Sequence, residues 1–306
     1  MDTPKDWKLD VIVPTANETE WPAKESLDWN MYRASVYPKI RFNPVVSSGD
    51  SFSFAKSVNR GIRESRPDSD ILLLNDDCFL DRGWAPKFWA AKRSHPTAGL
   101  FGALLRFPTK QDAISHHHPE PKEAYGDLFS GRRAVNHFMT AYQHAGGFIP
   151  LTVEESAYAI VRWALWYKAP LWALKALRDL YNNNGSVFPG HYHHMRGNNK
   201  INLVTAAAMM ITRDTIDEIG MFDERYVCGF EDTDYCLTAQ EKNILPCLVS
   251  DAVGSHYETL TTRHLENVKR DSYRKLIQKW PIERIRKAVK VGITHPAYCG
   301  CKDGYE

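Results

Sequence analysis

The stretch Ile71-Leu72-Leu73-Leu74-Asn75-Asp76-Asp77 decides the fold class of this chain. Four consecutive apolar residues predict a buried strand, and the amide and two carboxylates after them predict a polar turn at its carboxyl end. Working outward, short apolar runs predict further strands at residues 11–15, 39–46, 100–107, 203–212 and 246–250. Helical spacing predicts helices at residues 54–63, 84–93, 215–220 and 232–242. This alternation predicts an α/β domain with a mostly parallel central sheet flanked by helices.

Residues 115–198 interrupt the alternation with a segment rich in histidine, asparagine, proline and aromatic residues. Within it, residues 154–181 have a strongly helical pattern, so we interpret the segment as a largely helical insertion. From residue 266 to residue 291 the chain is basic and amphipathic, which predicts C-terminal helices. We therefore expect one domain over residues 1–265, carrying the insertion, and a C-terminal helical region and tail over residues 266–306.

The charge balance argues against nucleic acid as the main partner, because 39 basic and 37 acidic residues leave a net charge of only +2. The Lys/Arg-rich stretch at residues 263–290 keeps a local nucleic-acid contact open. The six cysteines form no CxxC pair, which favours free thiols in a reducing compartment. The N-terminus lacks the apolar run of a signal peptide, and no run of about 18 uncharged apolar residues occurs. We therefore expect a cytoplasmic protein.

The polar turn after the central predicted strand is a candidate metal site. In parallel sheets, ligands bind beyond the carboxyl ends of the strands, where Asn75, Asp76 and Asp77 are placed. Carboxylates there can hold Mg²⁺ or Mn²⁺ and leave coordination positions free for phosphate oxygens. The alternative is an ordinary turn, because Asn and Asp favour turns whether or not they bind anything.

The sequence Gly229-Phe230-Glu231-Asp232-Thr233-Asp234-Tyr235 places three acids at the start of a predicted helix. One of these carboxylates can serve as a general base that removes the proton of a sugar hydroxyl. Acids in a first helical turn are also explained by capping and by the helix dipole. His256 follows this cluster after a short predicted strand, and a neutral imidazole there can complete a metal site. The alternative interpretation is that His256 is a structural or exposed histidine.

Two features of the insertion are open to several interpretations. Its two clusters of histidines lack cysteines at zinc-ligand spacing, so we expect them to flank a pocket or lie at the surface rather than bind structural zinc. The clustered histidines are His116, His117, His118, His191, His193 and His194. The Trp-rich helix predicted at residues 155–181 has three interpretations: packing in a core, stacking on sugars, or contact with a membrane surface or a partner.

Several blocks of the sequence resemble, in order, the inverting glycosyltransferase family 2, whose members have the GT-A fold. The opening strand at residues 11–15, the helix at residues 54–62, the DxD-like residues 72–77 and the apolar run 204–211 are similar to the family's pattern. So are Ile219-Gly220-Met221-Phe222-Asp223-Glu224, Glu231-Asp232-Thr233-Asp234 and His256. The resemblance covers residues 1–106 and 200–265, and it implies a Rossmann-like GT-A domain.

The resemblance also implies roles for individual residues. Asp232 would be the catalytic base, and Asp77 and His256 would bind Mn²⁺ or Mg²⁺. The donor would contact residues of the opening strand, of the following helix and of the two acidic motifs: Pro14, Thr15, Asn59, Asn75, Asp76, Glu231 and Asp234. The implied reaction is displacement at the anomeric carbon of a nucleotide-sugar, with inversion, by a hydroxyl of a glycan or glycolipid.

The sequence departs from the family pattern in ways that leave the donor and acceptor open. Asn75 replaces the first acid of a strict DxD motif, as in rhamnosyl- and galactofuranosyl-transferring relatives. The usual ending of the second strand, which often helps to recognise the base, is reduced to residues 45–50, so the identity of the nucleotide stays open. The resemblance implies a UDP-, dTDP- or GDP-sugar as donor. A protein or modified nucleic acid remains an alternative acceptor. A carbohydrate-binding protein without turnover is the non-enzyme alternative, and a nucleotidyltransferase is disfavoured because no Gly- and Lys/Arg-rich loop follows Thr15.

Overall fold

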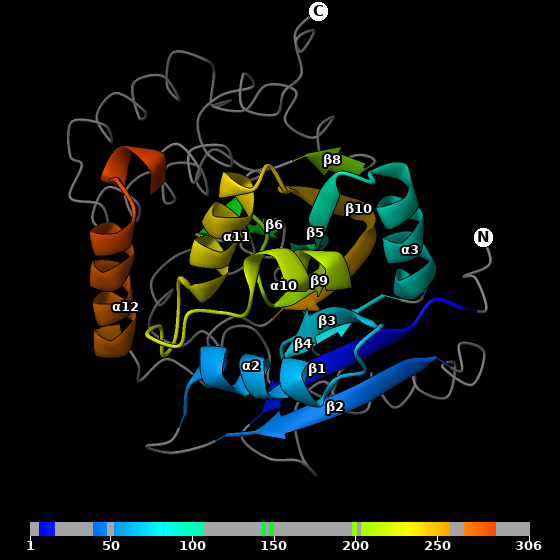
Figure 1. Ribbon diagram of the computed structural model, residues 1–306, viewed down its shortest axis with the longest axis horizontal. Coiled ribbons are helices and arrows are strands. Elements are labelled where there is room, and N and C mark those ends of the chain that lie inside the picture. The colour runs from blue at the N-terminus through cyan, green and yellow to red at the C-terminus, as the bar shows by residue number, and fades with distance from the viewer. Residues whose placement is uncertain are drawn as a thin grey trace, which may run out of the picture.

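A computed structural model of the chain describes residues 6–15, 39–47, 52–81, 83–106, 142–144, 147–149, 198–200, 203–256 and 266–285 (Figure 1). Its strands are β1 (Leu9–Thr15), β2 (Ile40–Val46), β3 (Asp70–Leu74), β4 (Cys78–Leu80), β5 (Ala98–Arg106), β6 (Tyr142–His144), β7 (Gly147–Ile149), β8 (Asn198–Lys200), β9 (Ala208–Ile211) and β10 (Leu245–His256). Its helices are α2 (Phe54–Glu64), α3 (Trp84–Ser94), α10 (Arg213–Ile219), α11 (Glu231–Glu241) and α12 (Glu266–Lys279). The predicted helix at residues 155–181 and the six clustered histidines at residues 116–118 and 191–194 lie outside the described residues.

The described strands form one sheet, whose main path runs β2-β1-β3-β9-β5-β10-β4. β2, β1 and β3 are parallel, β9 is antiparallel to both β3 and β5, and β10 is parallel to β5. β1, β2, β3, β5 and β10 therefore point the same way, and only β9 and β4 on this path run against them. This arrangement confirms the predicted α/β class with a mostly parallel sheet.

Helices cover both faces of the sheet (Figure 1). Alternate residues of β3 point to opposite faces, so Ile71 and Leu73 pack with α2, α10, α11 and α12, whereas Leu72 and Leu74 pack with α3. Gly61 allows α2 to approach β1 closely, because a Cβ atom there would meet Ile12 Cγ2 at 2.5 Å. The core is therefore split into two apolar layers by the sheet.

Three strands on the main path differ from the sequence prediction, and three short strands off it were not predicted: β6 and β7 lie within the segment expected to be a largely helical insertion, and β8 at its end. Residues 203–207, predicted as strand, precede β9 without strand structure, because their backbone groups bond to α11 and to the turn after β3 instead. β10 continues past residue 250 to His256, through an irregularity in its pairing with β5. β4 was not predicted; it is three residues long and pairs antiparallel with the end of β10.

The predicted C-terminal helix ends at Lys279, and helix resumes at residues 282–285. Pro281 explains the interruption, since the residue before a proline is disfavoured in helical conformation. Leu276 and Ile285 are fully buried in the same apolar cluster as α2 and α11. The division of the chain at residue 265 stays a prediction, but its C-terminal side packs on the main core.

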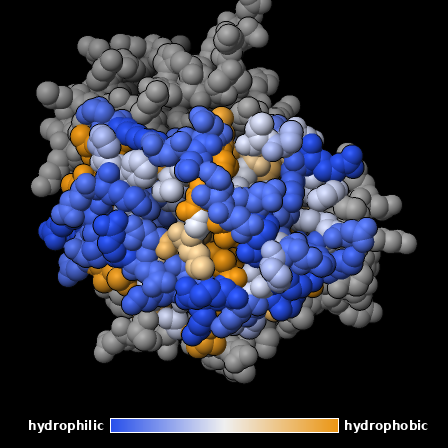
Figure 2. Space-filling view, in the orientation of Figure 1, coloured by the Kyte–Doolittle hydropathy of each residue, from blue (hydrophilic) through white to orange (hydrophobic). Residues whose placement is uncertain are grey.

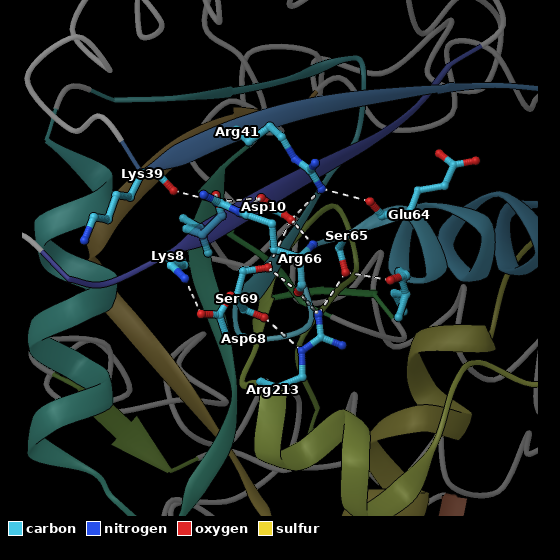
Figure 3. Close-up of polar contacts among 12 residues, drawn as sticks. Lys8, Asp10, Lys39, Arg41, Glu64, Ser65, Arg66, Asp68, Ser69 and Arg213 are labelled. Atoms are coloured by element: carbon cyan, nitrogen blue, oxygen red, sulfur yellow. Dashed lines mark hydrogen bonds and ion pairs between the residues drawn. The ribbon is translucent and has the colours of Figure 1, made fainter.

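The amino edge of the sheet, where the parallel strands begin, holds a dense polar cluster around Asp10 (Figure 3). Asp10 is fully buried and accepts hydrogen bonds from the backbone and side chain of Arg66, from Arg41 and from Ser69. Arg213 of α10 donates to the carbonyl oxygens of Ser69 and Arg66. Burial alone would raise the pKa of Asp10, but these partners hold it below its ordinary value. The cluster joins β1, β2, the loop before β3, and α10.

The face of the molecule in Figure 2 is largely hydrophilic, with hydrophobic residues confined to a narrow central strip and small spots. Large hydrophobic side chains that are exposed among the described residues are few: Val46, Met221, Leu245 and Ile277. In the described part of the chain, no helix combines the length and apolar character needed to cross a membrane.

Candidate active site

The candidate site lies at the carboxyl edge of the sheet, where β1 and β3 end. Thr15 is the last residue of β1, and residues 75–77 form the turn between β3 and β4. β4 folds back along the end of β10, and this pairing places Cys78 opposite His256. The unpredicted strand β4 is therefore what brings Asp77, which directly precedes it, beside His256.

Asn75, Asp77 and His256 are in direct contact. The Nε2 atom of His256 lies 3.1 Å from Oδ1 of Asp77 and 3.2 Å from Nδ2 of Asn75. A single ring nitrogen either donates or accepts a proton, so only one of these contacts is a hydrogen bond at a time. Asp77 and His256 are both buried, at 4% and 6% exposure. Within the described residues, Oδ1 of Asn75 is buried without a hydrogen-bond partner.

Asp76 lies beside this group and is buried at 9% exposure. Burial raises its pKa to about 7, and repulsion by the carboxylate of Asp77 adds to the effect. A hydrogen bond with the side chain of Thr15 partly offsets the rise. β1 thus contributes to the same polar cluster as the turn after β3.

The segment at residues 205–207 connects this cluster to α11. The backbone N–H of Asn75 donates to the carbonyl oxygen of Ala207 at 2.9 Å. The backbone N–H of Ala206 donates to Oδ2 of Asp232 at 3.2 Å, and the side chain of Thr205 also bonds to this carboxylate. Two backbone hydrogen bonds from adjacent residues therefore fix Asp232 relative to the turn after β3.

Asp232 lies in the first turn of α11, and the residue as a whole is partly exposed. Burial of the carboxyl group raises its pKa, while hydrogen bonds from Ala206 and from the backbone N–H of Thr233, at 2.7 Å, lower it. Glu231 is 8% exposed, and burial followed by repulsion from Asp232 raises its pKa to about 8. Its Oε2 atom is buried and has no hydrogen-bond partner in the described part of the chain.

The turn that leads into α11 is strained. Gly229 and Phe230 both have left-handed backbone conformations, with φ of 83° and 69°. Such a conformation is uncommon for a bulky residue such as phenylalanine, and strain of this kind gathers at functional sites. The turn ends directly before Glu231 and Asp232, so it sets the direction in which their backbone enters the helix.

Two residues expected at the donor are engaged elsewhere. Asn59 of α2 donates to the carbonyl oxygen of Phe222 at 2.8 Å and to Glu224 at 3.0 Å, and it accepts from the N–H of Phe222. Asp234 bonds through both carboxylate oxygens to side chains outside α11. The remaining expected donor residue, Pro14, lies in β1 opposite Val45 of β2.

The residues at the turn after β3 fit a divalent cation. No group of three or more His, Cys, Asp or Glu side chains suited to a metal occurs among the described residues. Asp77 and His256 do converge, however, and the unpartnered Oδ1 of Asn75 is an oxygen donor beside them. Magnesium-type ions are commonly held by one or two protein ligands, with water and substrate phosphates completing the shell. An incomplete protein set is therefore compatible with Mn²⁺ or Mg²⁺ bound together with a diphosphate.

Sequence reasoning missed several residues that shape this site. Thr205 and Ala206, which bond Asp232, lie in a run whose apolar pattern indicated only a strand. Lys279 and Trp280, which bond Asp234, follow it by 45 and 46 residues and carry no motif. Only the tertiary structure brings these residues to the start of α11.

No protein-family model matches the sequence, and no curated protein matches it. Several solved structures are similar in fold. A197 from STIV shares 10% sequence identity at a TM-score of 0.42, with 81% of this chain and 85% of that chain covered.

Two further similar structures are glycosyltransferases by name. GalNAc-T7 with UDP, GalNAc and Mn²⁺ shares 9% identity at a TM-score of 0.48, covering 93% of this chain and 50% of that chain. This chain thus spans half the length of that structure. The catalytic domain of Drosophila β1,4-galactosyltransferase 7, in complex with xylobiose, shares 9% identity at a TM-score of 0.39, covering 85% and 74%. All three TM-scores are below 0.5, so no inference about function rests on these likenesses.

Proposed function

We propose that this chain is a metal-dependent, inverting glycosyltransferase of the GT-A type, similar to glycosyltransferase family 2. It would move a sugar from a UDP-, dTDP- or GDP-sugar to a hydroxyl of a glycan or glycolipid. One observation carries the proposal: the Asp77–His256 pair and the fixed carboxylate of Asp232 lie along one edge of the sheet, joined through residues 206 and 207. Displacement of a diphosphate by a hydroxyl is assisted by a cation that offsets the charge of the leaving group and by a separate base that takes the proton of the hydroxyl.

Asp232 is the proposed base. Its carboxylate takes the proton of the acceptor hydroxyl while that oxygen forms a bond to the anomeric carbon. The bond from this carbon to the diphosphate oxygen breaks on the opposite side, and the diphosphate leaves with the electron pair, so the configuration inverts. Burial raises the pKa of Asp232 toward neutrality, and a general base is most effective when its pKa lies near the operating pH. Ala206 and Thr233 hold the carboxylate in one orientation.

The turn after β3 and the end of β1 form the proposed donor side. Asp77 and His256 would hold Mn²⁺ or Mg²⁺, and a bound cation would offset the negative charge that develops on the leaving diphosphate. Asp76, held by Thr15, would lie by the ribose or diphosphate. Pro14 and Thr15, at the end of β1, would contact the nucleotide.

The test is a thermal-shift screen of the full chain against UDP, dTDP and GDP, each with and without Mn²⁺. A ligand that binds only the folded state raises the melting temperature by mass action. We expect one nucleotide to raise the melting temperature only when Mn²⁺ is present, and a transfer assay with the corresponding sugar donors then follows. Glycan binding without any nucleotide-dependent shift would instead identify a carbohydrate-binding protein and overturn the proposal.

A further inference from the structure

The first turn of α11 is held in place by the end of α12. Asp234, two residues after Asp232, is 3% exposed. Its Oδ1 accepts hydrogen bonds from Nε1 of Trp280 at 2.7 Å and from the hydroxyl of Tyr226 at 3.3 Å. Nζ of Lys279 lies 2.8 Å from its Oδ2. Two of these three donors come from the last residue of α12 and the residue after it.

The ammonium of Lys279 also lies 3.4 Å from Oδ2 of Asp223. It therefore offsets the charge of two carboxylates, one of them almost fully buried. A buried carboxylate that loses its charged partner becomes costly to keep in place. Without Lys279, Asp234 would be expected to move toward water, and it would draw the first turn of α11 with it.

α12 also contacts the residue on the other side of the Glu231–Asp232 pair. The ring of Phe230 packs against the ring of Tyr273, with centroids 5.4 Å apart. Phe230 occupies the strained left-handed position before α11, and strain of this kind persists only where surrounding contacts hold it. The Glu231–Asp232 pair is thus flanked by anchors from α12 on both sides, one at residue 230 and one at residue 234.

We propose that Lys279 and Trp280 are positioning residues for Asp232, acting through Asp234, so that α12 belongs to the catalytic unit. This inference rests on the proposed function of Asp232 as a base. The two side chains bond Asp234 rather than the reacting atoms, and their effect is to keep the carboxylate of Asp232 aimed at the acceptor. A displacement of about 1 Å in a reacting group can lower a rate by about a hundredfold.

The chain contains a matched control for this arrangement at the opposite edge of the sheet. Asp70, the first residue of β3, is also 3% exposed and is also bound by a lysine and a tryptophan. Nζ of Lys92 and Nε1 of Trp7 each lie 2.7 Å from its Oδ2. The side chains of Lys92 and Lys279 have nearly equal exposure, 31% and 30%. Both clusters contain a buried aspartate bound by a lysine and a tryptophan, but the length of β3 separates Asp70 from the candidate site.

The experiment compares Lys279→Ala and Trp280→Phe with Lys92→Ala and Trp7→Phe in the full chain, measuring kcat, the donor KM and the free energy of unfolding. We expect all four to lose stability, but only the first two to lower kcat, by about tenfold or more with an unchanged donor KM. Lys279→Arg, which keeps the charge, should restore much of kcat. Equal effects of Lys279→Ala and Lys92→Ala on kcat would overturn the proposal.

Amide hydrogen exchange distinguishes failure of this inference from failure of the proposed function. Lys279→Ala should speed exchange at residues 230–236, whereas Lys92→Ala should leave those residues unchanged, whether or not the chain transfers sugar. Unchanged exchange there in Lys279→Ala would refute the positioning role. Faster exchange in a protein that transfers no sugar from any donor would instead refute the role of Asp232 as a base.

Discussion

The two edges of the central sheet hold buried carboxylates in opposite electrostatic situations. At the amino edge, Asp10 is bound by Arg66, Arg41 and Ser69, and its pKa lies below its ordinary value (Figure 3). At the carboxyl edge, Glu231 and its neighbour Asp232 have raised pKa values, and one oxygen of Glu231 has no partner among the described residues. Buried carboxyl groups are costly when they lack partners, so a group of them at one edge of the sheet marks where a ligand is expected.

The largest expected effect is on activity at the carboxyl edge. Asp232→Asn should lower kcat by about 10²–10⁴-fold, the usual contribution of a general base, while donor binding stays nearly intact. Asp10→Asn is the matched control at the amino edge, where the same isosteric change should lower stability without changing kcat. The measurement is steady-state kinetics of both variants. Full activity of Asp232→Asn would show that the base has been assigned wrongly.

The next effect is on stability at the amino edge. Arg66→Ala leaves Asp10 buried with Arg41, Ser69 and the backbone N–H of residue 66 as its remaining partners. Removing one member of a buried ion pair costs about 3–5 kcal/mol, and we expect about 3 kcal/mol here because the other partners remain. Urea unfolding should show a lower midpoint at an unchanged m-value. A loss below about 1 kcal/mol would mean that Arg66 does little to hold the edge together.

The third difference between the two edges is in metal-dependent ligand binding. Asp77→Ala should abolish the stabilisation that nucleotide and Mn²⁺ confer together, about 2.7 kcal/mol at a ligand concentration of 100 times Kd. Asp68→Ala removes an exposed carboxylate at the amino edge and should leave that stabilisation intact. Thermal shift with one nucleotide, titrated with Mn²⁺, measures both. A metal-dependent shift that survives in Asp77→Ala would place the cation elsewhere.

The smallest effect is the pH dependence of stability, which has opposite signs at the two edges. The pKa of Glu231 rises on folding from 4.5 to about 8, so between these values the folded state binds more protons and stability falls as pH rises. The slope is at most about 1.4 kcal/mol per pH unit. Glu231→Gln should reduce it in urea unfolding at several pH values, and the part due to Asp76 and Asp232, whose pKa values are also raised, should remain. An unchanged slope would show that Glu231 is not the group responsible.

Asp10 contributes a pH dependence of stability that is opposite in sign to that of Glu231. Because its pKa is lowered on folding, its contribution is complete above the ordinary value and is lost as pH falls through the folded-state pKa. Asp10→Asn should therefore flatten only the acid side of the stability profile, and Glu231→Gln only the side toward higher pH. Measuring both profiles separates the two edges within one experiment.

Much of the fold was predictable because local patterns agree with it. The buried run 71–74 predicted β3, and the helices predicted at residues 54–63 and 84–93 match α2 and α3 to within one residue. The run 203–212 misled, because apolar periodicity does not distinguish a buried strand from a buried loop whose backbone bonds to a neighbouring helix. The antiparallel direction of β9 is set by pairing with β3 and β5, which no local pattern encodes.

The fold class and the candidate acids Asp77 and Asp232 were predictable from the sequence, because apolar runs and polar strand ends are local properties of the chain. The contact between Asp77 and His256 through β4, and the hydrogen bond from Ala206 to Asp232, depend on the tertiary structure. It alone brought Lys279 and Trp280 to Asp234. These contacts join residues at least 26 positions apart, and such pairings depend on how whole elements pack rather than on any short stretch of sequence.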